Sequence, residues 1–224
     1  MTQTQDKIYL DGIISRVEKA RLKVSQHHIV KIVAVSKYSS VDEISKLYDI
    51  GQRAFGENKV QDLKAKSKEL EELPLEWHFI GNLQKNKINN LLDIAPSLFH
   101  ALDSIELANE LQKKLEVKKM TLDALLQINS AKEESKHGVM PEVACDIYKQ
   151  IQERCPNINL KGVMSIGAHT TDKDIVRKSF ETTYDIYSKL DGATICSMGM
   201  SSDFELAIEC GSNMVRLGSI MFNK

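Results

Sequence analysis

Short apolar runs alternate with longer amphipathic segments along the chain. The apolar runs are rich in β-branched and aromatic residues and are short enough to be buried strands. Between them, apolar residues recur at helical spacing. Strands are predicted at residues 31–36, 53–58, 75–81, 97–103, 122–129, 160–167, 193–199 and 213–219. The pattern therefore predicts eight strands in regular alternation with helices.

The amphipathic segments carry recognisable start and stop signals. Ser40 and Glu43 have the spacing of a capping box, and Gly51 can end the helix that they begin. Pro141 stands at another predicted helix start, where its missing N–H is not needed. Helices are predicted at residues 3–25, 41–50, 59–72, 84–92, 104–117, 141–154, 171–190 and 202–210, and the longest loop at 130–138.

Regular alternation of strands and helices predicts a parallel sheet with right-handed crossovers. Eight such units in 224 residues fit a closed (β/α)₈ TIM barrel, preceded by an extra N-terminal helix. A doubly wound open sheet is the alternative. No linker or low-complexity segment divides the sequence, so we expect a single domain over residues 1–224.

Composition narrows the range of partners. The 30 basic and 31 acidic residues give a formal net charge of −1, which argues against nucleic acid or an anionic membrane as a partner. No apolar run reaches the roughly 18 residues of a transmembrane helix, and the N-terminus lacks the apolar core of a signal peptide. The four cysteines and six histidines show no metal-ligand spacing. We therefore expect a cytoplasmic protein without a structural metal.

The first strand ends in Lys37, just before a predicted helix. Ligands gather at the carboxyl ends of the strands in parallel α/β folds. An amine held there is expected to be partly desolvated, which favours its neutral, nucleophilic form. The alternative is an ordinary solvated lysine in a βα loop.

The last two strands end in small residues suited to an anion. Gly199 and Ser201 follow strand seven, Ser202 and Glu205 have capping-box spacing, and Gly218-Ser219 follows strand eight. A phosphate commonly binds after strands seven and eight of such barrels, and a helix N-terminus there would favour it. The alternative is an ordinary capped helix and a glycine turn.

Two further polar residues stand in apolar runs. Arg216 lies within strand eight, and a buried arginine needs a partner, either a structural carboxylate or a ligand heteroatom. His78 lies in strand three, as a site residue or as a hydrogen-bonded core histidine. Together with Lys37 and the phosphate turns, Arg216 suits pyridoxal 5'-phosphate bound as an imine to the lysine. A Schiff-base aldolase with a phosphorylated sugar is the alternative.

Several motifs, in order from about residue 30 to residue 222, carry a resemblance to a known family. They are Ala34-Val-Ser-Lys37, Phe55-Gly-Glu-Asn58, Glu76-Trp-His-Phe-Ile-Gly81 with Gln84 and Asn86-Lys87, Gln127-Ile-Asn129, Leu160-Lys-Gly-Val-Met164, Ser197-Met-Gly-Met-Ser201 and Met214-Val-Arg-Leu-Gly218. Together they resemble the YggS/PROSC family of pyridoxal phosphate homeostasis proteins. Ser219 departs from the threonine that is usual in that family, but it keeps the hydroxyl.

The resemblance implies an alanine racemase N-terminal type of barrel without a second, β-rich domain. It implies that Lys37 carries the cofactor as an aldimine and that Arg216 faces the pyridine nitrogen. Phosphate contacts are implied for Ser201, Gly218 and Ser219, and a place in the pocket lining for Asn58 and His78.

For function, the resemblance implies a protein that binds, buffers and delivers the cofactor in vitamin B6 homeostasis. We expect it to be a monomer, with apo pyridoxal-phosphate enzymes as transient recipients of the cofactor. Robust catalysis is not expected. A pyridoxal-phosphate-dependent amino-acid racemase or a related enzyme is the alternative, but racemases of this type use a tyrosine from a second domain.

Overall fold

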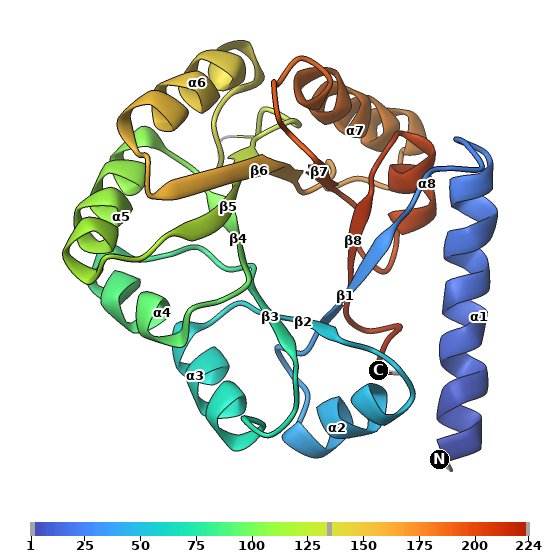
Figure 1. Ribbon diagram of the computed structural model, residues 1–224. Coiled ribbons are helices and arrows are strands. Elements are labelled where there is room, and N and C mark those ends of the chain that lie inside the picture. The colour runs from blue at the N-terminus through green and yellow to red at the C-terminus, as the bar shows by residue number, and fades with distance from the viewer. Residues whose placement is uncertain (1–2, 134–135, 223–224) are drawn as a thin grey trace.

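The computed structural model describes residues 3–133 and 136–222, in which eight parallel strands form a closed barrel surrounded by helices (Figure 1). Each strand pairs with the next along the chain, and β8 pairs with β1 from Lys31↔Met214 to Ala34↔Leu217. This last pairing closes the sheet. The predicted (β/α)₈ barrel is therefore confirmed, and the open sheet is wrong.

The strands lie close to their predicted positions. They are β1 (Lys31–Val35), β2 (Ala54–Glu57), β3 (Glu76–Phe79), β4 (Leu98–Leu102), β5 (Leu122–Ile128), β6 (Ile158–Ser165), β7 (Ile195–Ser197) and β8 (Met214–Leu217). β7 is shorter than predicted because the chain turns away at Gly199, whose φ of 91° leaves the extended region. β6 begins earlier because Ile158 already pairs with Leu122 of β5.

The helices alternate with the strands as predicted. They are α1 (Gln3–Leu22), α2 (Val41–Asp49), α3 (Val60–Glu69), α4 (Ile88–Ile94), α5 (Ile105–Lys118), α6 (Ala144–Arg154), α7 (Lys173–Tyr187) and α8 (Phe204–Glu209), with short 3₁₀ turns at Lys85–Lys87 and Pro141–Val143. The Ser40–Glu43 capping box is present. Residues 134–135 of the predicted loop lie outside the described residues.

The extra helix α1 stands outside the ring and packs against α8 (Figure 1). The Arg16 guanidinium binds the Glu205 carboxylate at 2.9 Å and lies 4.7 Å from the centroid of the Phe204 ring. Glu205 therefore faces α1 and does not cap its own helix. The predicted Ser202–Glu205 capping box is wrong: α8 begins at Phe204, and its N-cap is Asp203.

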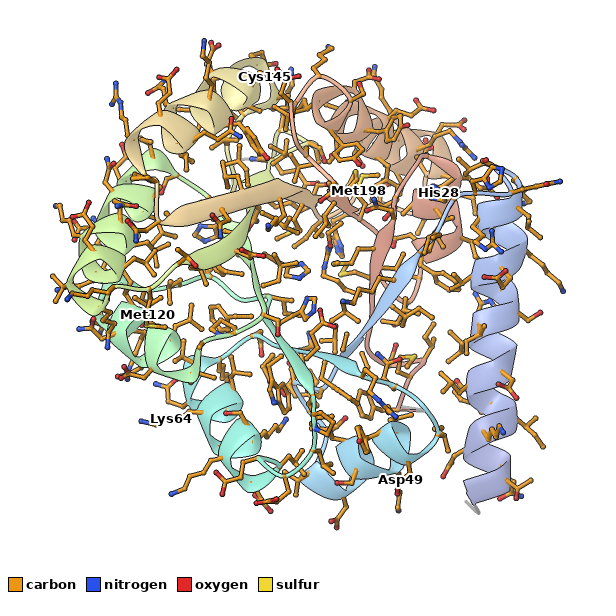
Figure 2. The ribbon with its side chains drawn as sticks, viewed as in Figure 1. His28, Asp49, Lys64, Met120, Cys145 and Met198 are labelled. Atoms are coloured by element: carbon orange, nitrogen blue, oxygen red, sulfur yellow. The ribbon has the colours of Figure 1, made fainter. Side chains whose placement is uncertain are left out.

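Side chains fill the centre of the barrel, so the barrel is a packed core and not a pore (Figure 2). Most of the buried residues are apolar, but the fully buried set includes the polar side chains of Glu57, His100 and Ser197. Buried polar groups require hydrogen-bond partners. The hydrogen-bond partners of Glu57 and Ser197 include Ser36, Lys66 and Arg216, which lie at or near the carboxyl ends of the strands.

Candidate functional site

A cavity of about 450 Å³ opens at the carboxyl ends of the strands. Five of the seven predicted site residues line it, although they lie far apart in the sequence: Lys37, Ser201, Arg216, Gly218 and Ser219. The rest of the wall comes from Val35, Tyr38, Ser39, Ile80, Met200, Ser202 and Phe222. A cavity of this size is typical of small-molecule and cofactor sites.

The backbone just before Lys37 is fixed by buried polar contacts. Ser36 donates from its N–H to Gly56 O (2.9 Å) and from Oγ to Glu57 Oε1 (2.7 Å). Lys66 Nζ donates to Ser36 O at 2.7 Å and to Glu57 Oε1 at 2.6 Å. Ser36 is thus held on both sides, which sets the position from which Lys37 leaves the strand. Neither Glu57 nor Lys66 was predicted from the sequence as part of the site, although a glutamate at the end of an apolar strand is a signal.

The Lys37 side chain itself is exposed. Its Nζ lies 5.1 Å from the centroid of the Tyr38 ring. The partial desolvation expected for this amine is therefore wrong in this structure, because β1 ends at Val35 and Lys37 lies in the turn beyond it. The lysine remains at the cavity wall, where a ligand could reach its amine.

Two turns form the small-residue side of the cavity. The Gly218 N–H donates to Ser201 Oγ at 3.1 Å, which ties the turn after β8 to the turn after β7. Asp203 Oδ1 accepts a hydrogen bond from the Met200 N–H at 2.6 Å. At Gly199 an added Cβ would lie 2.7 Å from the Ala207 Cβ, so close packing against α8 requires glycine there. The predicted juxtaposition of the two turns is present, but α8 is a short helix that starts beside a carboxylate.

Gly218 differs from Gly199 in this respect. A Cβ at Gly218 would meet its nearest neighbour, the Cβ of Val35, at 3.6 Å, an ordinary contact distance. Packing within the protein therefore does not require glycine at this position. The space in front of its backbone belongs to the cavity.

Arg216 is buried and faces the cavity from β8. Its Nη1 donates to Ser197 O (2.9 Å) and Oγ (2.7 Å), and its Nη2 donates to Ser165 O (2.9 Å). These partners are neutral oxygens, and no hydrogen bond from Arg216 to a carboxylate is found in the described part of the chain. Burial lowers the pKa of Arg216 to about 10, so the guanidinium is still charged at neutral pH.

Asn58 and His78 do not line this cavity. Asn58 is half-buried after β2, where its carbonyl approaches Gly81 so closely that a Cβ on Gly81 would lie 2.0 Å from the oxygen. His78 is buried within β3, and its ring lies between His100 and Glu76. This geometry matches the interpretation of His78 as a hydrogen-bonded core histidine. Its side chain points into the barrel interior, before the carboxyl end of β3.

Other features that would bear on function are metal sites, disulfides and membrane-spanning helices. The described residues contain no group of three or more His, Cys, Asp or Glu side chains that could hold a metal ion. All four cysteines are free. None of the helices over residues 3–133 and 136–222 is long and apolar enough to cross a bilayer.

Comparisons with known proteins agree with this geometry. The model of the alanine racemase N-terminal domain family matches residues 8–224. A pyridoxal phosphate homeostasis protein of Helicobacter pylori is 56% identical over 215 residues, which cover 96% of this chain and 97% of that protein. The chain belongs to the pyridoxal phosphate homeostasis protein family. The resemblance found in the sequence motifs is thus confirmed.

Proteins of lower identity also match over most of this chain. The pyridoxal phosphate homeostasis protein of Homo sapiens is 37% identical over 211 residues, which cover 87% of this chain and 76% of that protein. The structure of PipY from Synechococcus elongatus PCC7942 with PLP bound has a TM-score of 0.79 and 30% identity, covering 92% of this chain and 99% of PipY. Diaminopimelate decarboxylase from m. jannaschi, at 17% identity and a TM-score of 0.76, shares the fold.

Proposed function

We propose that this chain binds pyridoxal 5'-phosphate in the cavity at the mouth of its barrel, attached through the Lys37 amine. The observation that carries the proposal is the convergence of one lysine, one buried arginine and two glycine–serine turns on that cavity. The cofactor supplies an aldehyde that condenses with an amine. The PLP-bound structure of PipY, a relative with the same fold, supports this choice of ligand over a phosphorylated sugar.

The residues present fit this cofactor. Gly218 lines the cavity and carries no side chain, so a phosphate can approach its backbone. Ser201, Gly218 and Ser219 are the proposed phosphate contacts. Arg216 lines the same cavity, donates to the neutral oxygens of Ser197 and Ser165, and can also donate to the pyridine nitrogen. A cation there keeps that nitrogen unprotonated, which weakens the ring as an electron sink.

Of the two predicted pocket residues outside the cavity lining, Asn58 remains a proposed neighbour of the site. His78 lies deeper in the barrel and would act on the cofactor only through other residues. We further expect the whole of residues 1–224 to form one cofactor-binding domain, which works as a monomer in the cytoplasm.

The proposed role is to hold, buffer and deliver the cofactor to apo enzymes, without robust catalysis. Relatives are named as homeostasis proteins. A racemase needs a second base opposite the lysine. Tyr38 lines the cavity, but it follows Lys37 directly in the chain and is 79% exposed. We therefore expect alanine and serine to racemise at background rates; ordinary enzymatic rates in a chiral assay would support the racemase alternative.

Absorbance and trapping with borohydride test the attachment. Purified protein should show an imine band near the visible edge, and reduction should fix the cofactor to Lys37, as read by peptide mass spectrometry. Lys37→Ala should abolish the adduct, whereas Lys113→Ala, at an exposed lysine outside the cavity, should not. If Lys37→Ala protein still traps the cofactor on another lysine, the assignment of Lys37 is wrong.

A further inference from the structure

A chain of hydrogen-bonded side chains runs through the barrel interior from Arg216 toward the end opposite the cavity. Ser197 Oγ lies 2.7 Å from Arg216 Nη1 and 3.3 Å from His100 Nδ1. His100 Nε2 lies 2.8 Å from His78 Nδ1. His78 Nε2 in turn lies 3.1 Å from Oε1 of Glu76, the first residue of β3. The chain thus connects the cavity wall to the base of the barrel.

The chemistry of the end groups gives this chain one direction. Arginine can only donate, so Ser197 Oγ accepts from Arg216 and must give its own proton to another acceptor. Among the described residues, the acceptor within reach is His100 Nδ1. His100 then carries its proton on Nε2 and donates to His78, which donates from its own Nε2 to Glu76. An ionised carboxylate can only accept, so both ends require the same direction.

The charges along the chain agree with this assignment. The hydrogen bond from His78, followed by that from Lys31, lowers the pKa of Glu76 to about 2, so this carboxylate is ionised at neutral pH. Burial above all, together with the nearby positive charges of Arg216 and Lys31, holds the pKa of His100 well below its usual range. His100 is therefore neutral, with one ring nitrogen free to accept.

We propose that Glu76, His78 and His100 are positioning residues for Arg216, holding its guanidinium at the cavity through Ser197. With an acceptor at His100 Nδ1, the hydroxyl proton of Ser197 points away from Arg216 and leaves an oxygen lone pair for Nη1. Without that acceptor the hydroxyl can rotate, and Arg216 loses a hydrogen bond that fixes its orientation. The inference rests on the proposed function, in which Arg216 faces the ring nitrogen of the cofactor.

The tautomers of His78 and His100 can be measured in the full-length protein without cofactor. In protein labelled with ¹⁵N at the histidine rings, His78 and His100 should each show a protonated Nε2 and an unprotonated Nδ1 at neutral pH. The signals are assigned by comparison with variants in which one histidine at a time is replaced. A proton on His100 Nδ1, or a doubly protonated ring at either position, would overturn the proposed direction. This measurement does not depend on cofactor binding.

A matched pair of substitutions at His100 separates positioning from mere filling of the core. Asparagine places its oxygen near the former Nδ1 and can still accept from Ser197, whereas glutamine places its amide near the former Nε2 and serves only His78. Both should unfold at similar urea concentrations. His100→Gln should weaken binding of pyridoxal 5'-phosphate about tenfold and shift its visible band, as loss of one hydrogen bond to a charged group predicts. His100→Asn should stay within about threefold of the parent.

Equal binding by the two variants, with both folded, would show that the chain only satisfies buried polar groups. If neither variant folds, the tautomers of the parent protein still decide the direction of the chain. If the parent itself does not bind the cofactor, the proposed function fails, and the ring ¹⁵N signals then stand as the test of the hydrogen-bond chain alone.

Discussion

Replacing Lys66 by methionine should strongly destabilise this barrel. The Glu57 carboxylate that Lys66 neutralises is 0% exposed, and the Lys66 side chain is 14% exposed. Their N–O distance is 2.6 Å, and Glu57 Oε2 has no hydrogen-bond partner among the described residues. Lys66→Met would therefore leave a buried charge with only the Ser36 hydroxyl as a partner.

The expected magnitude follows from that burial. Breaking a buried ion pair by removing one partner costs about 3–5 kcal/mol. A domain has about 5–15 kcal/mol of total stability, so the loss is a large fraction of it. Removing both charges should cost less, because no uncompensated carboxylate remains. The double variant Glu57→Gln with Lys66→Met should accordingly be more stable than Lys66→Met alone.

Urea unfolding followed by circular dichroism and by the fluorescence of Trp77, the single tryptophan, measures these free energies. The matched control is Lys113→Met. This substitution also removes the lysine of an ion pair, in this case with Glu110, but the Lys113 and Glu110 side chains are 67% and 35% exposed. Such a surface pair contributes about 0–1 kcal/mol. If Lys66→Met costs no more than Lys113→Met, or if the double variant is the least stable, the buried pair does not have the role inferred for it.

Three further predictions follow from other parts of the structure. Gly218→Ala should change the free energy of unfolding by less than about 1 kcal/mol, because the added Cβ meets only ordinary contacts, yet it should weaken cofactor binding in a titration followed by absorbance. Unchanged affinity would place the phosphate elsewhere. His100 has a lowered pKa in the folded state, so below about pH 6.5 the unfolded chain binds the extra proton and stability falls by up to about 1.4 kcal/mol per pH unit. Urea unfolding between about pH 7 and pH 5 should show this slope, and His100→Asn should reduce it; an identical slope would mean that His100 is not the group responsible. Arg16→Ala should cost about 0.5–1 kcal/mol, since an exposed ion pair and a ring contact are lost together, and Arg16→Lys should recover only part of it in the same assay.

The fold could be read from the sequence because its strands are short, apolar and regularly spaced. The closure of the sheet could be expected from the number of strands, but only the pairing of Lys31 with Met214 demonstrates it. Helix ends were less predictable where tertiary contacts compete with local signals. Glu205 has the spacing for a cap, yet it pairs with Arg16 from a helix 189 residues earlier in the chain.

The cavity was predictable to the extent that strand ends converge in a barrel. Lys37, Arg216 and Gly218 could be placed at one mouth from their positions after or within strands. The depth of a side chain along its strand was not predictable in the same way. His78 precedes the end of β3 and points inward, and its partner His100 stands on another strand, so their contact depends on barrel geometry.

The pairing of β1 with β8 has a consequence for the newly made polypeptide. The lysine follows β1, whereas the arginine and the glycine–serine turn belong to β8 and the turn after it, so the lysine leaves the ribosome well before them. A nascent chain that lacks β8 holds the lysine amine without Arg216 and without the proposed phosphate contacts at Gly218 and Ser219. Under the proposed function, capture of the cofactor should thus wait until β8 has paired with β1.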